Sequence, residues 1–151
     1  MEWSWVQSRI ERAIDEFCTR IKSAVPTVRI SRYTLPPETK TFAVGADFAT
    51  GGRDPDDESE LSVFLERATH RVPPDPGYAA RYRLPPYEPG SDLIWFFLEH
   101  KGEDVGSLDP IVLPPDRDSK EYEDGVREYL QAAELRLIER VDPIVDLLGA
   151  S

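Results

Sequence analysis

The chain has 151 residues, of which 40% are hydrophobic, and a formal net charge of −11. This length fits one domain, and the hydrophobic content is enough to bury a core, which excludes a disordered chain. A single cysteine excludes an internal disulfide and a cysteine-rich zinc site, and no apolar run reaches the ~18 residues that cross a bilayer. We therefore expect one globular domain over residues 1–151. We place it in the cytoplasm, because the N-terminal segment has no apolar signal core.

Residues 4–24 are predicted to form an amphipathic helix that ends before Pro26. Its apolar residues recur at spacings of three and four, which gives one continuous stripe. The stripe consists of Trp3, Val6, Ile10, Ala13, Ile14, Phe17, Ile21 and Ala24. Cys18 lies at the edge of this stripe with no histidine nearby in sequence, so we expect a partly buried and inert thiol.

Two strands, 27–34 and 40–49, are predicted to follow as an antiparallel hairpin. Alternation in the second strand places Phe42, Val44, Ala46 and Phe48 on one face. Residues 59–69 fit a helix or a strand equally well, because their apolar residues match both spacings. Alternation over 78–84 predicts a further strand. The run 92–100 is apolar on both faces, which is typical of a central strand.

Residues 119–141 are predicted to form a second helix. Asp118 and Glu121 fit a capping box at its start, and Pro143 is expected to end or kink it. Four aliphatic-Pro-Pro triplets separate the predicted strands, because proline cannot donate to a strand ladder. The order of helix, strands and helix favours an α+β fold. We expect an antiparallel or mixed sheet of about four to six strands flanked by long N-terminal and C-terminal helices.

The acidity is uneven along the chain. Residues 1–50 carry a net charge of +1, residues 51–110 carry −7 and residues 111–151 carry −5. A negative field repels phosphate and therefore disfavours nucleic acids and anionic membranes as partners. The same field speeds encounter with a basic protein, although an acidic surface also serves plain solubility.

The densest acidic segment holds five acids in seven residues, namely Asp54, Asp56, Asp57, Glu58 and Glu60. Its start resembles a calcium-binding loop, but Ser59 and Leu65 stand where that loop requires Gly and Glu, so we predict no metal and no cofactor. We expect either a solvated loop or a docking surface for a basic protein, extended by Asp116–Glu128. Trp5 and Tyr87 are the aromatic residues expected to be exposed as anchors for that partner.

A second set of candidates is catalytic. Glu99 and Lys101 leave the predicted strand 92–100 on the same face, and Asp47 lies on another predicted strand. This arrangement resembles that of the PD-(D/E)xK nuclease families. The resemblance implies a metal-dependent hydrolase in which Asp47 and Glu99 hold the metal and Lys101 is catalytic. The competing interpretation is that these are strand-end residues facing solvent. The two histidines, His70 and His100, have no third ligand at a metal-binding spacing.

These observations favour a small, non-catalytic, acidic cytoplasmic binding protein, such as an inhibitor or immunity-type protein that neutralises a basic partner. The metal-dependent hydrolase is one alternative. The other is an α+β module that binds a ligand or forms oligomers, which would use a hydrophobic groove or the apolar stripe of residues 4–24 as a symmetric interface. The sequence leaves the oligomeric state and the identity of the partner open.

Overall fold

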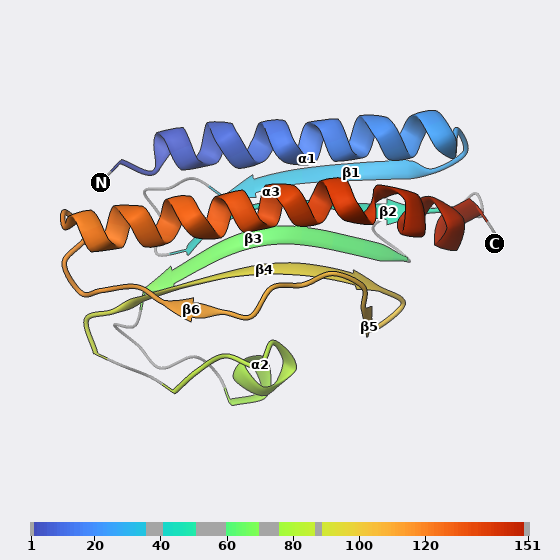
Figure 1. Ribbon diagram of the computed structural model, residues 1–151. Helices are drawn as coiled ribbons and strands as arrows, with labels where there is room; N and C mark the ends of the chain where they lie inside the picture. The colour runs from blue at the N-terminus through green and yellow to red at the C-terminus, as the bar shows by residue number, and fades with distance from the viewer. Residues whose placement is uncertain (1, 36–40, 51–59, 70–75, 87–88, 150–151) are drawn as a thin grey trace.

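The computed structural model describes residues 2–35, 41–50, 60–69, 76–86 and 89–149 (Figure 1). Two long helices lie at the two ends of the chain, and a sheet is built between them, so the fold is α+β as predicted. The elements are α1 (Ser4–Ala24), β1 (Arg29–Leu35), β2 (Thr41–Ala49), β3 (Leu61–Thr69), α2 (Pro76–Arg81), β4 (Asp92–His100), β5 (Glu103–Asp104), β6 (Ile111–Val112) and α3 (Lys120–Gly149).

The sheet has the strand order β1-β2-β3-β4-β5, and β6 also pairs with β4. All of these pairings are antiparallel, and β1 and β2 form the predicted hairpin. Residues 61–69 form a strand, which settles the ambiguity between helix and strand. This strand lies between β2 and β4 and buries side chains on both faces, which is why its apolar residues also match a helical spacing.

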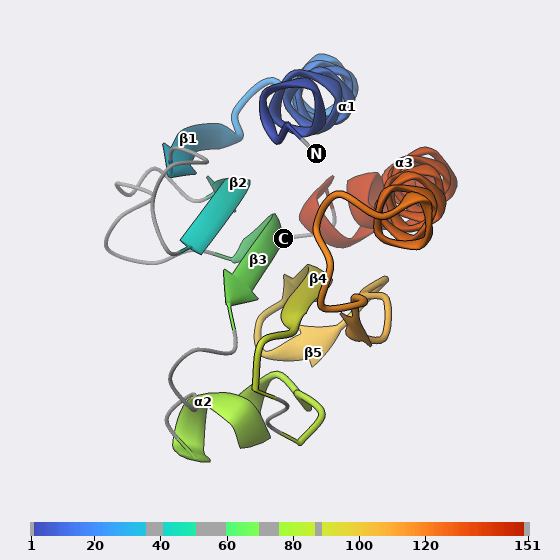
Figure 2. The same ribbon diagram turned by 90° about the vertical axis from the view of Figure 1, so that its left-hand side faces the viewer.

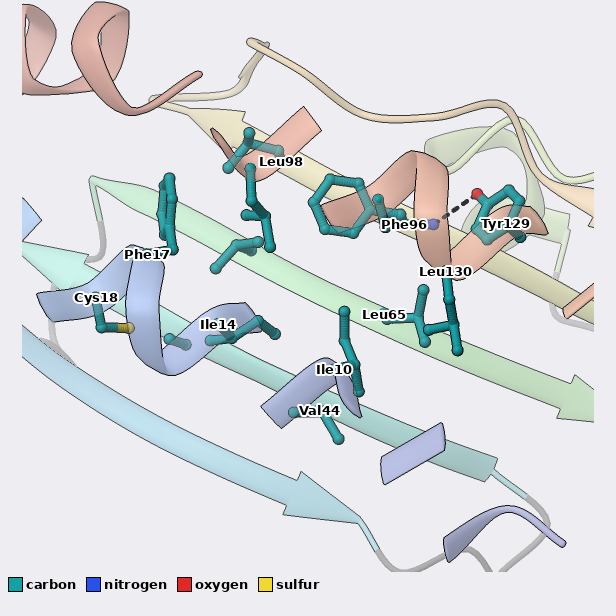
Figure 3. Close-up of a cluster of buried hydrophobic side chains, with 14 of the residues drawn as sticks. Ile10, Ile14, Phe17, Cys18, Val44, Leu65, Phe96, Leu98, Tyr129 and Leu130 are labelled. Carbon is teal, nitrogen blue, oxygen red and sulfur yellow. Dashed lines mark hydrogen bonds between the residues drawn. The ribbon is translucent and has the colours of Figure 1, made fainter. Parts of the chain in front are cut away.

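Helices α1 and α3 lie side by side on one face of the sheet and run in the same direction (Figures 1 and 2). The main core lies between these helices and the inward-facing residues of β2, β3 and β4 (Figure 3). The apolar stripe of α1 is part of this core, since Val6, Ile10 and Ile14 are fully buried. Most of this stripe therefore packs inside the molecule and is not available for the symmetric interface that the sequence left open.

Cys18 lies in the same core and is 7% exposed. Burial is the main reason that its pKa rises from 9.0 to about 11. The predicted burial of this thiol is therefore confirmed. A group with this pKa remains a protonated, poorly nucleophilic thiol at neutral pH.

On the opposite face of the sheet, the described residues form a second apolar cluster over β3 and β4. There Phe64, Leu93 and Trp95 form a smaller cluster, on which Tyr82 and Leu84 pack. The predicted strand over 78–84 is wrong, because residues 76–81 form the short helix α2. Tyr82 and Leu84, the last two apolar residues of that alternation, follow the helix and pack on this cluster.

Helix α3 differs from its prediction at both ends. It begins after Ser119, whose hydroxyl accepts a hydrogen bond from the Tyr122 N–H at 3.1 Å, so this serine caps the helix in place of Asp118. It also continues through Pro143 to Gly149. Pro143 removes one helical hydrogen bond, but burial of Ile144 and Leu148 in the core offsets that loss.

Candidate functional site

The described residues of the two predicted acidic segments lie at opposite ends of the sheet. Glu60 adjoins the end at which Phe48, Leu61 and His100 are register partners, where α3 finishes (Figure 1). Residues 116–128 lie at the other end, near Asp92, where α3 begins. Five of the predicted partner-binding residues lie outside the described residues, namely Asp54, Asp56, Asp57, Glu58 and Tyr87.

The described member of the first segment, Glu60, is held by Thr50. Its Oε1 atom accepts hydrogen bonds from the Thr50 N–H at 3.2 Å and from the Thr50 hydroxyl at 2.6 Å. Burial raises the pKa of Glu60, but these hydrogen bonds and the charge of Lys101 outweigh burial, so the pKa is lowered. Glu60 therefore stays ionised and ties the two ends of the β2–β3 connection together.

The second acidic segment, residues 116–128, contacts Trp5 through Arg127. The Arg127 guanidinium lies 4.5 Å from the centroid of the half-buried Trp5 ring, and it donates a hydrogen bond to Glu123 at 2.9 Å. Trp5 is on α1 and Arg127 is on α3, so the fold brings together two regions that the sequence nominated separately. An aromatic side chain beside charged groups is typical of the centre of a protein interface.

The exposed side chains of residues 116–128 are mostly acidic. We call the following residues the α3 acidic surface: Asp116, Asp118, Glu121, Asp124 and Glu128. From 116 to 128 the chain carries six acidic and three basic side chains. Of the three bases, Arg117 is engaged by Asp92 and Arg127 by Glu123. The acids of the first turn complement the positive end of the helix dipole, but Asp124 and Glu128 lie beyond that turn.

A buried polar cluster anchors the start of α3 to the sheet. Asp92, which is 3% exposed, accepts hydrogen bonds from Arg117 Nε at 2.8 Å and from Arg117 Nη2 at 2.9 Å. The Tyr122 hydroxyl donates a third hydrogen bond to Asp92 at 2.6 Å. Burial, followed by this bond to a carboxylate, raises the pKa of Tyr122. The cluster fixes the position of the α3 acidic surface relative to β4.

The sequence did not reveal this cluster, because its members are 25 and 30 residues apart. One signal was present, since Asp92 opens an otherwise apolar and buried strand. A carboxylate at such a position requires partners, because burying an unpaired charge is costly.

The catalytic candidates lie on the face of the sheet opposite the two long helices. Asp47 and Glu99 are both register partners of Ser62, so one strand separates them. The Ser62 hydroxyl donates to Asp47 at 2.8 Å, and both Glu99 oxygens accept hydrogen bonds from Arg81. Lys101 is exposed, in the turn after β4. Within the described residues, no group of three or more His, Cys, Asp or Glu side chains is placed to hold a metal ion.

No protein-family model matches the chain, and no curated protein or solved structure matches it either. Among the helices in the described ranges, none is both long and apolar enough to cross a membrane. We therefore infer the function from the geometry and charge of the described residues.

Proposed function

We propose that this is a non-catalytic binding protein of the cytoplasm that engages a basic protein, in the manner of an inhibitor or an immunity protein. The observation that carries the proposal is the position of Trp5. Its half-buried ring contacts Arg127, which lies on α3 between Asp124 and Glu128 of the α3 acidic surface. The sequence adds the acids of residues 54–60 as a second region of the same charge.

The chemistry of the surface suits a basic partner. Exposed carboxylates raise the rate of encounter with a cation-rich surface, and a neighbouring aromatic ring supplies apolar contact once the charges have met. The anchoring of α3 through Asp92 keeps this surface rigid before binding, which lowers the entropic cost of association.

The experiment is quantitative capture of proteins from the native lysate at low and at high salt. Asp124→Lys with Glu128→Lys should reduce recovery of the captured basic protein by about tenfold, because the electrostatic attraction is reversed there. The matched control is Glu103→Lys with Glu139→Lys, which changes the net charge equally at two exposed positions outside this surface.

The proposal predicts that the control retains the partner and that high salt releases it, since exposed charges are screened. Capture that is equal for both double variants would show that α3 is not the binding surface. Capture that is indifferent to salt would exclude an electrostatic mode of recognition.

A further inference from the structure

A groove of about 260 Å³ lies between α1 and α3, beyond the contact between Trp5 and Arg127. Its floor is apolar and is formed by Ala13, Phe17, Leu137 and Val141. Its α1 side carries the exposed residues Arg12 and Arg20, and its α3 side carries Ile138. The groove is separate from the α3 acidic surface, which lies nearer the start of both helices.

The apolar side chains beside this groove are the most exposed in the described part of the chain. Ile138, which lines the groove, is 59% exposed, and Leu135, one turn earlier on α3 and outside the lining, is 51% exposed. The other large exposed hydrophobic residues reach at most 38%. A pair of adjacent apolar side chains on the rim of an apolar groove is typical of a surface that is covered by a partner.

The charge of the groove differs from that of the rest of the chain. Three arginines and two glutamates line it, whereas the whole chain carries −11. Arg9 lies opposite Glu134 and forms an ion pair with it. Because α1 and α3 run in the same direction, Arg20 lies three turns further on, at the level of Asp142 and Asp146 on α3. The α1 side of the groove, with three arginines and Glu16, is therefore net basic, and the α3 side is acidic.

We propose that a second copy of this chain covers the groove, in a symmetric dimer whose two-fold axis runs along it. This axis is parallel to the helices. Rotation about it therefore places α1 of each copy against α3 of the other copy, without a shift along the helices. Arg20 of each copy then faces Asp142 and Asp146 of the other copy. Leu135 and Ile138 fill the centre from both sides. A two-fold interface requires a surface that is complementary to itself, and the opposite charges of the two helices provide one.

The available area is sufficient for a specific but reversible dimer. The 21 residues of α1 give a length of about 31 Å at 1.5 Å per residue. Two adjacent helices span about 20 Å across, so each copy offers about 600 Å². The total of about 1,200 Å² lies at the lower limit for specific interfaces. A basic partner does not suit this groove, because Arg12 and Arg20 would repel it.

Sedimentation velocity of the full chain over a wide range of concentrations tests the proposal. The mass of the wild type should rise from monomer to dimer, and Ile138→Glu should weaken association by about tenfold or more, as for a central interface residue. Leu147→Glu is the matched control, because Leu147 is an exposed apolar residue on α3 outside the groove. A wild type that stays monomeric, or equal effects of the two substitutions, would overturn the proposal.

A charge exchange tests the orientation of the two copies. Arg20→Asp alone and Asp142→Arg alone should each weaken self-association, because each places like charges opposite one another twice in the dimer. An equimolar mixture of the two variants should associate as well as the wild type, because both contacts are then restored between unlike copies. Failure of the mixture to recover would overturn the dimer with its axis along the groove.

Discussion

The exposed side of α3 has two halves of different character. Both halves present acids, but only the second half, which carries Glu139, Asp142 and Asp146, also presents large apolar side chains, of which Leu135 and Ile138 are the most exposed. The buried side is uniform, since it packs on the sheet along the whole helix. Burial in the core explains the buried stripe but not the contrast on the exposed side. That contrast therefore reflects what each half meets in solution, which we propose is a basic protein for the first half and a second copy for the second.

The largest expected effect comes from breaking the attachment of the first half of α3 to the sheet. Asp92→Ala should lower the free energy of unfolding by about 3–5 kcal/mol, because it leaves Arg117 and the Tyr122 hydroxyl without their buried acceptor. Urea denaturation measures the loss. The exposed pair of Arg83 and Asp104 gives the control, since Arg83→Ala removes this ion pair but leaves the backbone hydrogen bonds of Asp104, and should cost about 1 kcal/mol or less. Similar costs for the two substitutions would mean that the Asp92 cluster does not anchor α3.

The contrast between the halves also predicts their response to alkaline pH. The buried phenols of Tyr122 and Tyr129 lie in the first half, and burial raises the pKa of both. A raised folded pKa contributes stability below the unfolded value of about 10, and this stability is lost as pH rises above it. We expect a loss of about 1 kcal/mol per tyrosine at pH 11. Hydrogen exchange should show the first half of α3 losing protection before the second, and simultaneous loss would contradict this assignment.

The sequence predicted the features of α3 that repeat along the helix but not those that depend on distant partners. The period of its apolar residues identified the helix and its buried side. The cap by Ser119 was missed, because Asp118 and Ser119 are adjacent residues that can both cap a helix. The continuation through Pro143 was missed, because it depends on burial of the last turns of α3 in the core. The prediction for β3 was ambiguous and the strand predicted over 78–84 was wrong for a similar reason. Both depend on which residues pack on the second face of the sheet.

For the candidate site, too, the sequence predicted individual residues but not the contacts between them. Trp5 and Asp116–Glu128 could be nominated from exposure and charge, but nothing in the sequence placed them side by side. The contact between Trp5 and Arg127 joins the two ends of the chain and depends on the packing of α1 beside α3. The groove was likewise invisible, because Ile138 fits a helix pattern whether or not a neighbouring helix leaves space beside it.

The smallest expected effect comes from two charge reversals, which distinguish the contribution of the helix dipole to stability from that of the net charge. Glu121→Lys and Asp146→Lys make the same change at exposed positions in the first and last turns of α3. The last turn carries no basic residue, so Asp146→Lys should stabilise the protein by about 0.5 kcal/mol, and Glu121→Lys should destabilise it by a similar amount. Thermal unfolding at low salt measures both, at a concentration where the chain is monomeric, because Asp146 faces Arg20 in the proposed dimer and association would change the apparent stability. If both variants gained stability, relief of repulsion in a chain of charge −11 would outweigh the helix dipole, and the acids of the first turn would then have no stabilising role. Opposite signs would mean that Glu121 stabilises the helix, whereas Asp124 and Glu128, which lie beyond the first turn, are the acids that we assign to a basic partner.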